Sequence, residues 1–445
     1  MLFTLLIFSC SSKDELVNPT TLDNELDNLL TTNAFVGGKI NITFPKSWEL
    51  SKIPQDPLNP ITKEKIELGK LLFHETGISR NPLKLESLKT YSCSSCHSEQ
   101  AGFQAGIPQG IGEGGLGYGS KGEKRTKNKH YTDLEIDVQP VRSPSALNIA
   151  YQTNILWNGQ FGATHLNKGT ESSWTKGSPK EKNFNGFEGV ETQAIAGQDV
   201  HRLNISKIFL DEMPIYRQLF QNAYPTMNLN DNLEIKINAG LAIAAYERSL
   251  LATDAPFQKW LGGNYGAMTE DQKKGAIIFF GKGGCANCHN GPSLAAMNFY
   301  ALGMNDLKNG NYGNSNVVAI TDNKPEFLGR GGFTGNPQDN YKFKVPQLYN
   351  LKDSPFYGHG SSFNSIENVI RYKNNGVKEN QKTPDSQLAK EFKPLNLTEQ
   401  EISQLAEFIK NGLYDQNLSR YLPSSLPSGL FFPNNDNVSR IDLGK

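Results

Sequence analysis

Two short strings of the sequence carry residue types that attach haem. Cys93-Ser-Ser-Cys96-His97 and Cys285-Ala-Asn-Cys288-His289 both follow the pattern Cys-x-x-Cys-His. Two thiols three residues apart on one helical turn can bond to the two vinyl groups of a haem, and the histidine that follows then lies under the iron as its axial ligand. The sequence therefore predicts two covalently bound haems c. Their cofactor-binding residues are Cys93, Cys96, His97, Cys285, Cys288 and His289, and the two histidines are the iron ligands.

Two other uses of paired cysteines fit this pattern less well. A redox disulfide is expected within a thioredoxin-like βαβ pattern, which the sequence around the two strings does not show. One zinc site made of all four thiolates would leave both histidines unexplained, and the two pairs lie far apart along the chain. Haem attachment is the interpretation that uses every residue of both strings.

The fifth cysteine, Cys10, ends a short apolar run that begins at Met1. The run is too short to span a bilayer and is typical of the end of a secretory signal, after which Cys10 would be lipidated. A disordered apolar terminus is the alternative. We expect residues 1–10 to be a lipoprotein-type signal segment and residues 11–40 to be a flexible tether. The protein would then lie in the periplasm, attached to the membrane only through a lipid anchor.

The elements that must position the haem strings are expected to be mainly helices. Thr269–Gln272 and Thr398–Glu401 are capping boxes that open helices, residues 234–251 form an amphipathic helix, and sustained strand patterns are absent. The 445 residues include 42 glycines and 23 prolines, which favours long irregular loops. We predict a mainly α fold with two c-type cytochrome domains, one haem in each, over residues 41–265 and 266–445. The charge balance of 45 basic and 45 acidic residues argues against a nucleic-acid partner.

The order of several sequence blocks resembles the bacterial dihaem cytochrome c peroxidase and MauG superfamily. The resemblance spans about residues 60–412. The peroxidases of this superfamily reduce hydrogen peroxide, and MauG-type enzymes oxidise tryptophans of a partner protein during the maturation of a quinone cofactor. The blocks that carry the resemblance, besides the two haem strings, are Glu67–Phe73, Arg142–Asn148, Leu156–Gly159, Gln193–Ala194, Leu328–Pro337, Phe343–Asn350 and Ser354–Gly360.

The resemblance implies roles for four residues of the active centre. His97 corresponds to the proximal ligand of the peroxidatic haem, and His289 to that of the electron-transferring haem. Trp157 falls where the family has a tryptophan between the haems, so we expect it to relay electrons, with a plain core tryptophan as the alternative. Gln193 matches a distal glutamine whose amide can hydrogen-bond to bound peroxide.

The sequence departs from the family at the distal acid. The family has a glutamate about ten residues after the distal glutamine, and here His201 takes that place when a two-residue gap is allowed. We interpret His201 as the group that takes a proton from one peroxide oxygen and returns it to the other, because imidazole titrates in the right range. Two alternatives stay open: His201 ligates iron directly, or it is a surface histidine. His130 is the single, poorly matching candidate for the histidine that caps the resting N-terminal haem.

Two further departures concern the second haem and a metal ion. Where the peroxidases have a methionine ligand, the chain has Tyr372, as MauG-type enzymes do, so we expect Tyr372 to ligate this iron. The alternatives are Met304, another residue, or no protein ligand. The family also has an interdomain calcium, which the resemblance would place at the carbonyls of Asp353 and Pro355. The asparagine that helps to hold it is replaced by Arg142, whose charge would repel calcium, so calcium is doubtful. Residues 162–187 are an insertion of unknown purpose.

Three functions fit these residues. The first is an oxidoreductase, a cytochrome c peroxidase that reduces hydrogen peroxide to water with electrons from a small soluble donor such as a cytochrome c or a cupredoxin. The second is a MauG-like oxidase that acts on side chains of a partner protein. The third is an electron carrier without catalysis, in which both irons keep six ligands. We take the first as the best supported, since function depends on the site and not on the fold alone.

Overall fold

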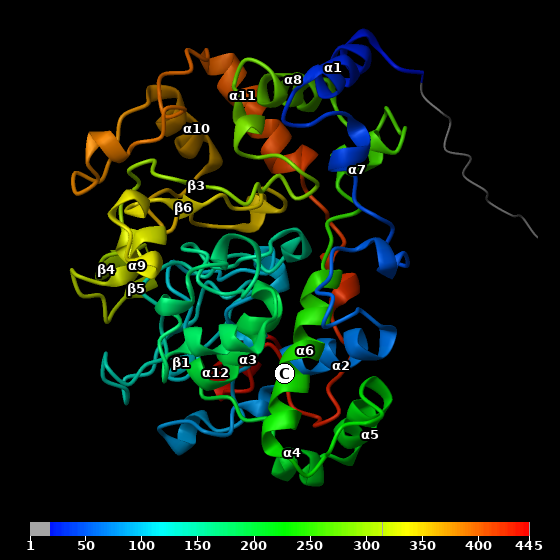
Figure 1. Ribbon diagram of the computed structural model, residues 1–445, viewed down its shortest axis with the longest axis vertical. Coiled ribbons are helices and arrows are strands. Elements are labelled where there is room, and N and C mark those ends of the chain that lie inside the picture. The colour runs from blue at the N-terminus through cyan, green and yellow to red at the C-terminus, as the bar shows by residue number, and fades with distance from the viewer. Residues whose placement is uncertain (1–17, 314, 445) are drawn as a thin grey trace, which may run out of the picture.

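The computed structural model describes residues 18–313 and 315–444, so the predicted signal segment with Cys10 lies outside the described residues. Helices dominate the fold, with short two-stranded antiparallel sheets, which confirms a mainly α architecture. Figure 1 shows α2 to α6 in one half of the molecule, and α1, α7, α8, α10 and α11 in the other. In the described part of the chain, none of the helices has the length and apolar character needed to cross a membrane.

The helices of the N-terminal half are α2 (Lys63–His74), α3 (Gly189–Val200), α4 (Lys207–Glu212), α5 (Pro214–Ala223) and α6 (Asn232–Ser249). Those of the C-terminal half are α7 (Pro256–Leu261), α8 (Glu270–Phe280), α9 (Arg330–Thr334), α10 (Ile366–Asn375) and α11 (Glu399–Glu407). Two terminal helices, α1 (Thr21–Thr32) and α12 (Asn437–Asp442), complete the set in the described residues. The strands pair as β1 (Gly115–Leu116) with β2 (Thr126–Lys127), β3 (Phe299–Tyr300) with β6 (Phe343–Lys344), and β4 (Gly310–Tyr312) with β5 (Ser315–Val317).

Close helix contacts in both halves depend on glycine. A Cβ atom added at Gly69 of α2 would lie 1.9 Å from the carbonyl oxygen of Ala242 in α6. In the other half, a Cβ atom at Gly275 of α8 would lie 2.0 Å from the carbonyl oxygen of Gln404 in α11. Because no other residue leaves room for these approaches, the glycines set how closely the helices around each haem string pack. The capping boxes predicted at Thr269 and Thr398 are confirmed.

A flexible tether is expected for residues 11–40, but residues 21–32 within it are folded. Residues 21–32 form α1, and its Leu26 and Leu30 are fully buried. Asp23 of the same helix forms a 2.7 Å ion pair with Lys273 of α8. The prediction is corrected for this segment because its polar composition concealed two leucines four residues apart, which place one apolar stripe against α8.

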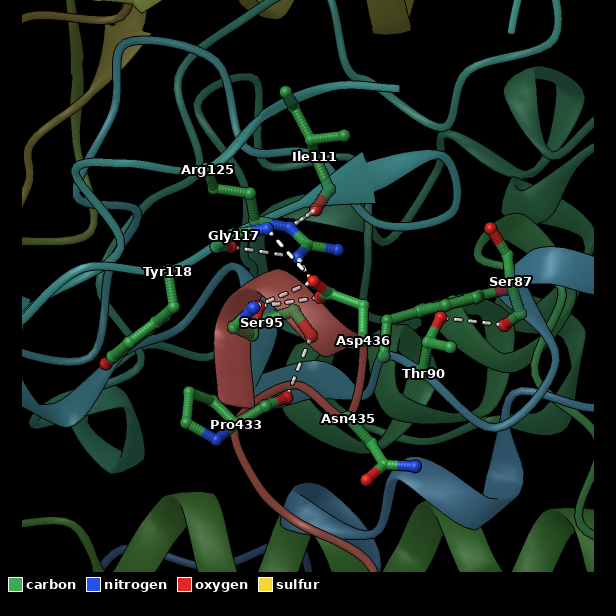
Figure 2. Close-up of polar contacts among 12 residues, drawn as sticks. Ser87, Thr90, Ser95, Ile111, Gly117, Tyr118, Arg125, Pro433, Asn435 and Asp436 are labelled. Atoms are coloured by element: carbon green, nitrogen blue, oxygen red, sulfur yellow. Dashed lines mark hydrogen bonds and ion pairs between the residues drawn. The ribbon is translucent and has the colours of Figure 1, made fainter. Parts of the chain in front are cut away.

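The last residues of the chain pack against the N-terminal half. Figure 2 shows this tail beside the first haem string, where the Ser95 hydroxyl donates to the Pro433 carbonyl at 3.1 Å. Asp436 forms a buried ion pair with Arg125 at 3.7 Å, and the amide of Asn435 donates to the Thr90 carbonyl at 2.9 Å. The tail therefore packs onto the residues that precede and follow the cysteines of the N-terminal half.

Candidate active site

The histidine of each haem string is held by a backbone carbonyl. Nδ1 of His97 lies 3.2 Å from the carbonyl oxygen of Phe103, and Nδ1 of His289 lies 2.9 Å from that of Leu294. A carbonyl can only accept, so Nδ1 must carry the hydrogen, and the bare Nε2 is left to bind a metal. Burial lowers the pKa of both imidazoles to about 4, which keeps them neutral as ligands. Both strings thus present a neutral imidazole whose Nε2 could hold the iron of a haem.

The cysteines of the two strings are free thiols beside different helices. Each first cysteine starts a short 3-10 turn, at Cys93–Ser95 and at Cys285–Asn287. Burial raises the pKa of the Cys96 and Cys285 thiols to about 12, so neither is poised as a thiolate. The described geometry favours neutral thiols available for thioether bonds.

A cavity of about 300 Å³ opens beside the second haem string, and its wall is mainly apolar. Cys285, Cys288 and His289 line it, together with Lys344 and Lys373. Burial lowers the pKa of Lys344 to about 7 and that of Lys373 to about 8, and neither lysine forms an ion pair in the described residues. Amines in the wall of an apolar cavity can pair with the carboxylates of a haem, so the donors and the cavity suit this cofactor.

Trp157 lies where the sequence places an electron relay, in the wall of the same cavity. Its indole Nε1 donates to the carbonyl of Arg142 at 2.8 Å, and its ring centroid lies 6.2 Å from that of His359. His359 in turn stacks on Phe343 at 3.6 Å. The indole is therefore fixed between segments of the two halves rather than packed in an ordinary core.

Gln193 lies in α3 and His201 caps the C-terminal end of that helix, with Gly197 between them on the same side. A Cβ atom added at Gly197 would lie 3.5 Å from Nε2 of Gln193 and 3.8 Å from Cδ2 of His201. Residues four apart share a helix face, so the spacing alone brings these three together. Because glycine has no side chain, nothing from position 197 stands between the amide of Gln193 and the imidazole of His201.

A buried carboxylate orients His201. Nδ1 of His201 lies 2.9 and 3.2 Å from the two carboxylate oxygens of Asp137, whose side chain is only 4% exposed. Burial alone would lower the pKa of His201, but the charge and the hydrogen bond of Asp137 outweigh it and raise that pKa above its ordinary value. This contact does not match a free surface histidine, and it leaves Nε2 as the group that can move a proton or bind iron.

Tyr372 and His130 form hydrogen bonds with residues outside the haem strings. Tyr372 of α10 donates its hydroxyl to the carbonyl of Leu302 at 2.5 Å and is not among the residues that line the cavity. Met304, the alternative ligand, does line it. His130 lies at the surface, where its Nδ1 is 2.9 Å from Glu86, so capping of the haem would require its loop to move.

Comparisons with known proteins relate the whole chain, rather than single residues, to dihaem proteins. The family model for di-haem cytochrome c peroxidase matches residues 63–266. A methylamine utilization protein MauG from Methylorubrum extorquens is 27% identical over 364 residues, which are 80% of each chain. A cytochrome c551 peroxidase from Nitrosomonas europaea is 26% identical over 320 residues, 71% of this chain and 75% of that protein.

These matches relate the chain to the dihaem cytochrome c peroxidase/MauG superfamily. Two solved structures have a similar fold. The crystal structure of a MauG-like protein associated with microbial copper homeostasis covers 83% of this chain and 96% of its own, with a TM-score of 0.57 and 22% identity. The dihaem peroxidase BthA from Burkholderia thailandensis gives a TM-score of 0.50 at 12% identity, over 83% of this chain and 90% of that one.

Asp137 and the two cavity lysines were not among the residues predicted from the sequence. Asp137 lies 64 positions before His201, and no local pattern connects them. Gly197 could have been found, because it stands four residues after Gln193 and four before His201. The spacing along one helix is visible in the sequence, whereas a contact between distant segments is not.

Proposed function

We propose that this protein is a dihaem c-type peroxidase that reduces hydrogen peroxide to water at the N-terminal haem, with electrons from a small soluble donor protein. The observation that carries the proposal is the α3 face of Gln193, Gly197 and His201, backed by Asp137. An amide that can hydrogen-bond to peroxide and an oriented imidazole that can move its proton suit peroxide cleavage.

Each residue of this face has its own proposed role in the reaction. When bound, haem supplies the iron at which peroxide is held and reduced. The Gln193 amide would hydrogen-bond to the peroxide, and Nε2 of His201 would take the proton from one oxygen and return it to the departing one. Asp137 would hold the imidazole with Nδ1 protonated throughout. Two electrons and two protons then convert one peroxide into two waters.

The electrons would enter through the C-terminal haem held by His289 and pass toward the N-terminal haem by way of Trp157. This proposal rests on the position of the indole in the cavity wall beside His289 and on its fixed orientation toward Arg142. Met304 in the same wall is compatible with a thioether ligand, which raises the potential of a haem and suits it to receive electrons from a soluble donor.

A MauG-like oxidase is the second candidate, and one residue favours it. Tyr372 occupies the position at which the resemblance implies the second ligand, and a phenolate would lower the potential of that haem. To ligate iron, its hydroxyl would have to leave the Leu302 carbonyl. In that case the oxidising equivalent would be shared by both haems and used on side chains of a partner protein.

Turnover experiments separate the two candidates. The haem-loaded protein is mixed with hydrogen peroxide and a reduced cytochrome c or cupredoxin, and oxidation of the donor is followed. Sustained turnover supports the peroxidase, whereas rapid reaction with peroxide without donor oxidation supports the MauG-like oxidase. If the haem spectrum does not change when peroxide is added, both enzyme candidates are contradicted, and the function that fits is an electron carrier without catalysis.

We also propose that the protein works in the periplasm, since haem bound through thioethers and the signal-like residues 1–10 both indicate export. The lipid anchor at Cys10 is part of this proposal. Labelling of the expressed protein with a fatty acid, with Cys10→Ser as the control, tests the anchor.

A further inference from the structure

Arg142 is a buried cation that has no carboxylate partner. Only 2% of the residue is exposed, and it forms no ion pair in the part of the chain that is described. Its guanidinium donates to the carbonyl oxygens of Ile107 and Ala105, both at 2.9 Å, and to the side-chain oxygens of Ser354 at 2.9 Å and Gln104 at 3.3 Å. Burial lowers its pKa to about 10, which still leaves it charged at neutral pH.

These four oxygens come from both halves of the molecule. Gln104, Ala105 and Ile107 follow the first haem string, whereas Ser354 belongs to the C-terminal half. The backbone of Arg142 joins the halves as well, because its amide donates to the carbonyl of His359 at 2.8 Å. The guanidinium therefore stands at the junction of the halves, within a set of neutral oxygen atoms.

Trp157 depends on the same residue. Its indole donates to the carbonyl oxygen of Arg142 at 2.8 Å, so the backbone held by the guanidinium also fixes the ring between the halves. A change in how Arg142 is held would be transmitted directly to the tryptophan.

The residues around Arg142 do not fit the calcium that the resemblance implies. Carbonyl and hydroxyl oxygens are ligands that calcium prefers, but here their lone pairs already accept hydrogen bonds from a positive group. The implied carbonyls belong to Asp353 and Pro355, and the residue between them, Ser354, is bonded to Arg142. A divalent cation would meet a fixed positive charge within a few ångströms and would have to displace it.

We propose that the Arg142 guanidinium takes the place of the interdomain calcium ion. It ties the two halves together through oxygens next to the carbonyls that the resemblance assigns to calcium, and it makes the haem-loaded protein independent of calcium. The inference goes beyond the proposed function and does not depend on whether the enzyme is a peroxidase or a MauG-like oxidase.

Calcium dependence of the haem-loaded wild type is the first test. The melting temperature is measured in excess EGTA and in about 1 mM calcium, with the calcium content of the dialysed protein determined by mass spectrometry. We expect the same melting temperature in both buffers and no retained calcium. A saturable rise of the melting temperature with calcium, or one calcium retained per chain, would overturn the proposal.

Arg142→Asn supplies the second test, with Arg330→Asn as its matched control. Arg330 is also buried and also donates to carbonyls, those of Asn158, Gly159 and Leu166, but no calcium is implied there. Both variants should melt about 5–10 °C below wild type in EGTA, as expected for the loss of a buried charged network. Addition of calcium should raise the melting temperature of Arg142→Asn and leave that of Arg330→Asn unchanged.

The outcomes of the second test are decisive in both directions. If calcium raises the melting temperature of Arg142→Asn but not that of Arg330→Asn, the oxygens at this junction can bind either a guanidinium or calcium, as the proposal requires. Melting of Arg142→Asn at the wild-type temperature, or an absence of recovery, would overturn the proposal. If Arg142→Asn does not fold, Arg142→Lys is tested instead, because it keeps the positive charge. The proposal requires that Arg142→Lys folds and that calcium does not change its melting temperature.

Discussion

The carboxylate of Asp137 offers the sharpest test of the distal site. Asp137→Asn keeps the size of the side chain but removes the charge that faces Nδ1 of His201. A hydrogen bond to a charged group contributes about 1.5–3 kcal/mol, which corresponds to about 10- to 150-fold in rate if it serves only to orient and charge the imidazole. We therefore expect Asp137→Asn to react with peroxide about 10- to 150-fold more slowly, and His201→Ala about 10²- to 10⁴-fold more slowly.

The pH dependence makes this prediction specific. The pKa of His201 is raised above its ordinary value of 6.5, so the imidazole is still protonated at pH 6.5. It becomes a base only as the pH rises through this raised pKa. The rate of the wild type should therefore increase with pH through a midpoint above 6.5. Without Asp137, burial acts unopposed and lowers the pKa, so the midpoint should move to lower pH even though the maximal rate falls.

Stopped-flow mixing with peroxide, at several pH values and with haem content checked, measures both effects. Asp133→Asn is the control, because Asp133 is an exposed carboxylate in the same region that pairs with Lys127. Adding Asp137→Asn to His201→Ala should cost nothing more, since the two residues act as one unit. A midpoint that does not move in Asp137→Asn would refute the reasoning. A new high-spin iron signal in His201→Ala would instead identify this histidine as an iron ligand.

Three other predictions concern the haems. Cys93→Ala combined with Cys96→Ala should remove one of two haems, as measured by haem staining of denaturing gels, and retention of both would contradict thioether attachment. Gly197→Leu should slow the peroxide reaction about 10²-fold by filling the space beside His201, with haem content unchanged; an undiminished rate would place peroxide elsewhere. Met304→Leu should change the visible spectrum and potential of the second haem, whereas a change in Tyr372→Phe instead would favour the MauG-like candidate.

Local sequence patterns were sufficient for the elements that carry the haem strings. The capping boxes at Thr269 and Thr398 depend on residues three positions apart, and the helix expected over residues 234–251 is observed at 232–249. A capping box is formed by residues that are close together in the sequence, so it can be predicted without knowing how distant segments pack. The α1 helix was missed because its burial depends on α8, about 250 residues away, which no local pattern reveals.

The same distinction explains what could be foreseen of the site. Gln193 and His201 could be paired from the sequence because one helix separates them by two turns. Asp137 and the oxygens around Arg142 come from loops whose course is fixed only when both halves have packed. The sequence shows that Arg142 stands where the family has an asparagine. What this replacement does to a metal site depends on the oxygens that surround the side chain, which the sequence does not reveal. The sequence could therefore suggest that calcium is absent, whereas only the packed structure identifies a guanidinium that bonds to both halves in its place.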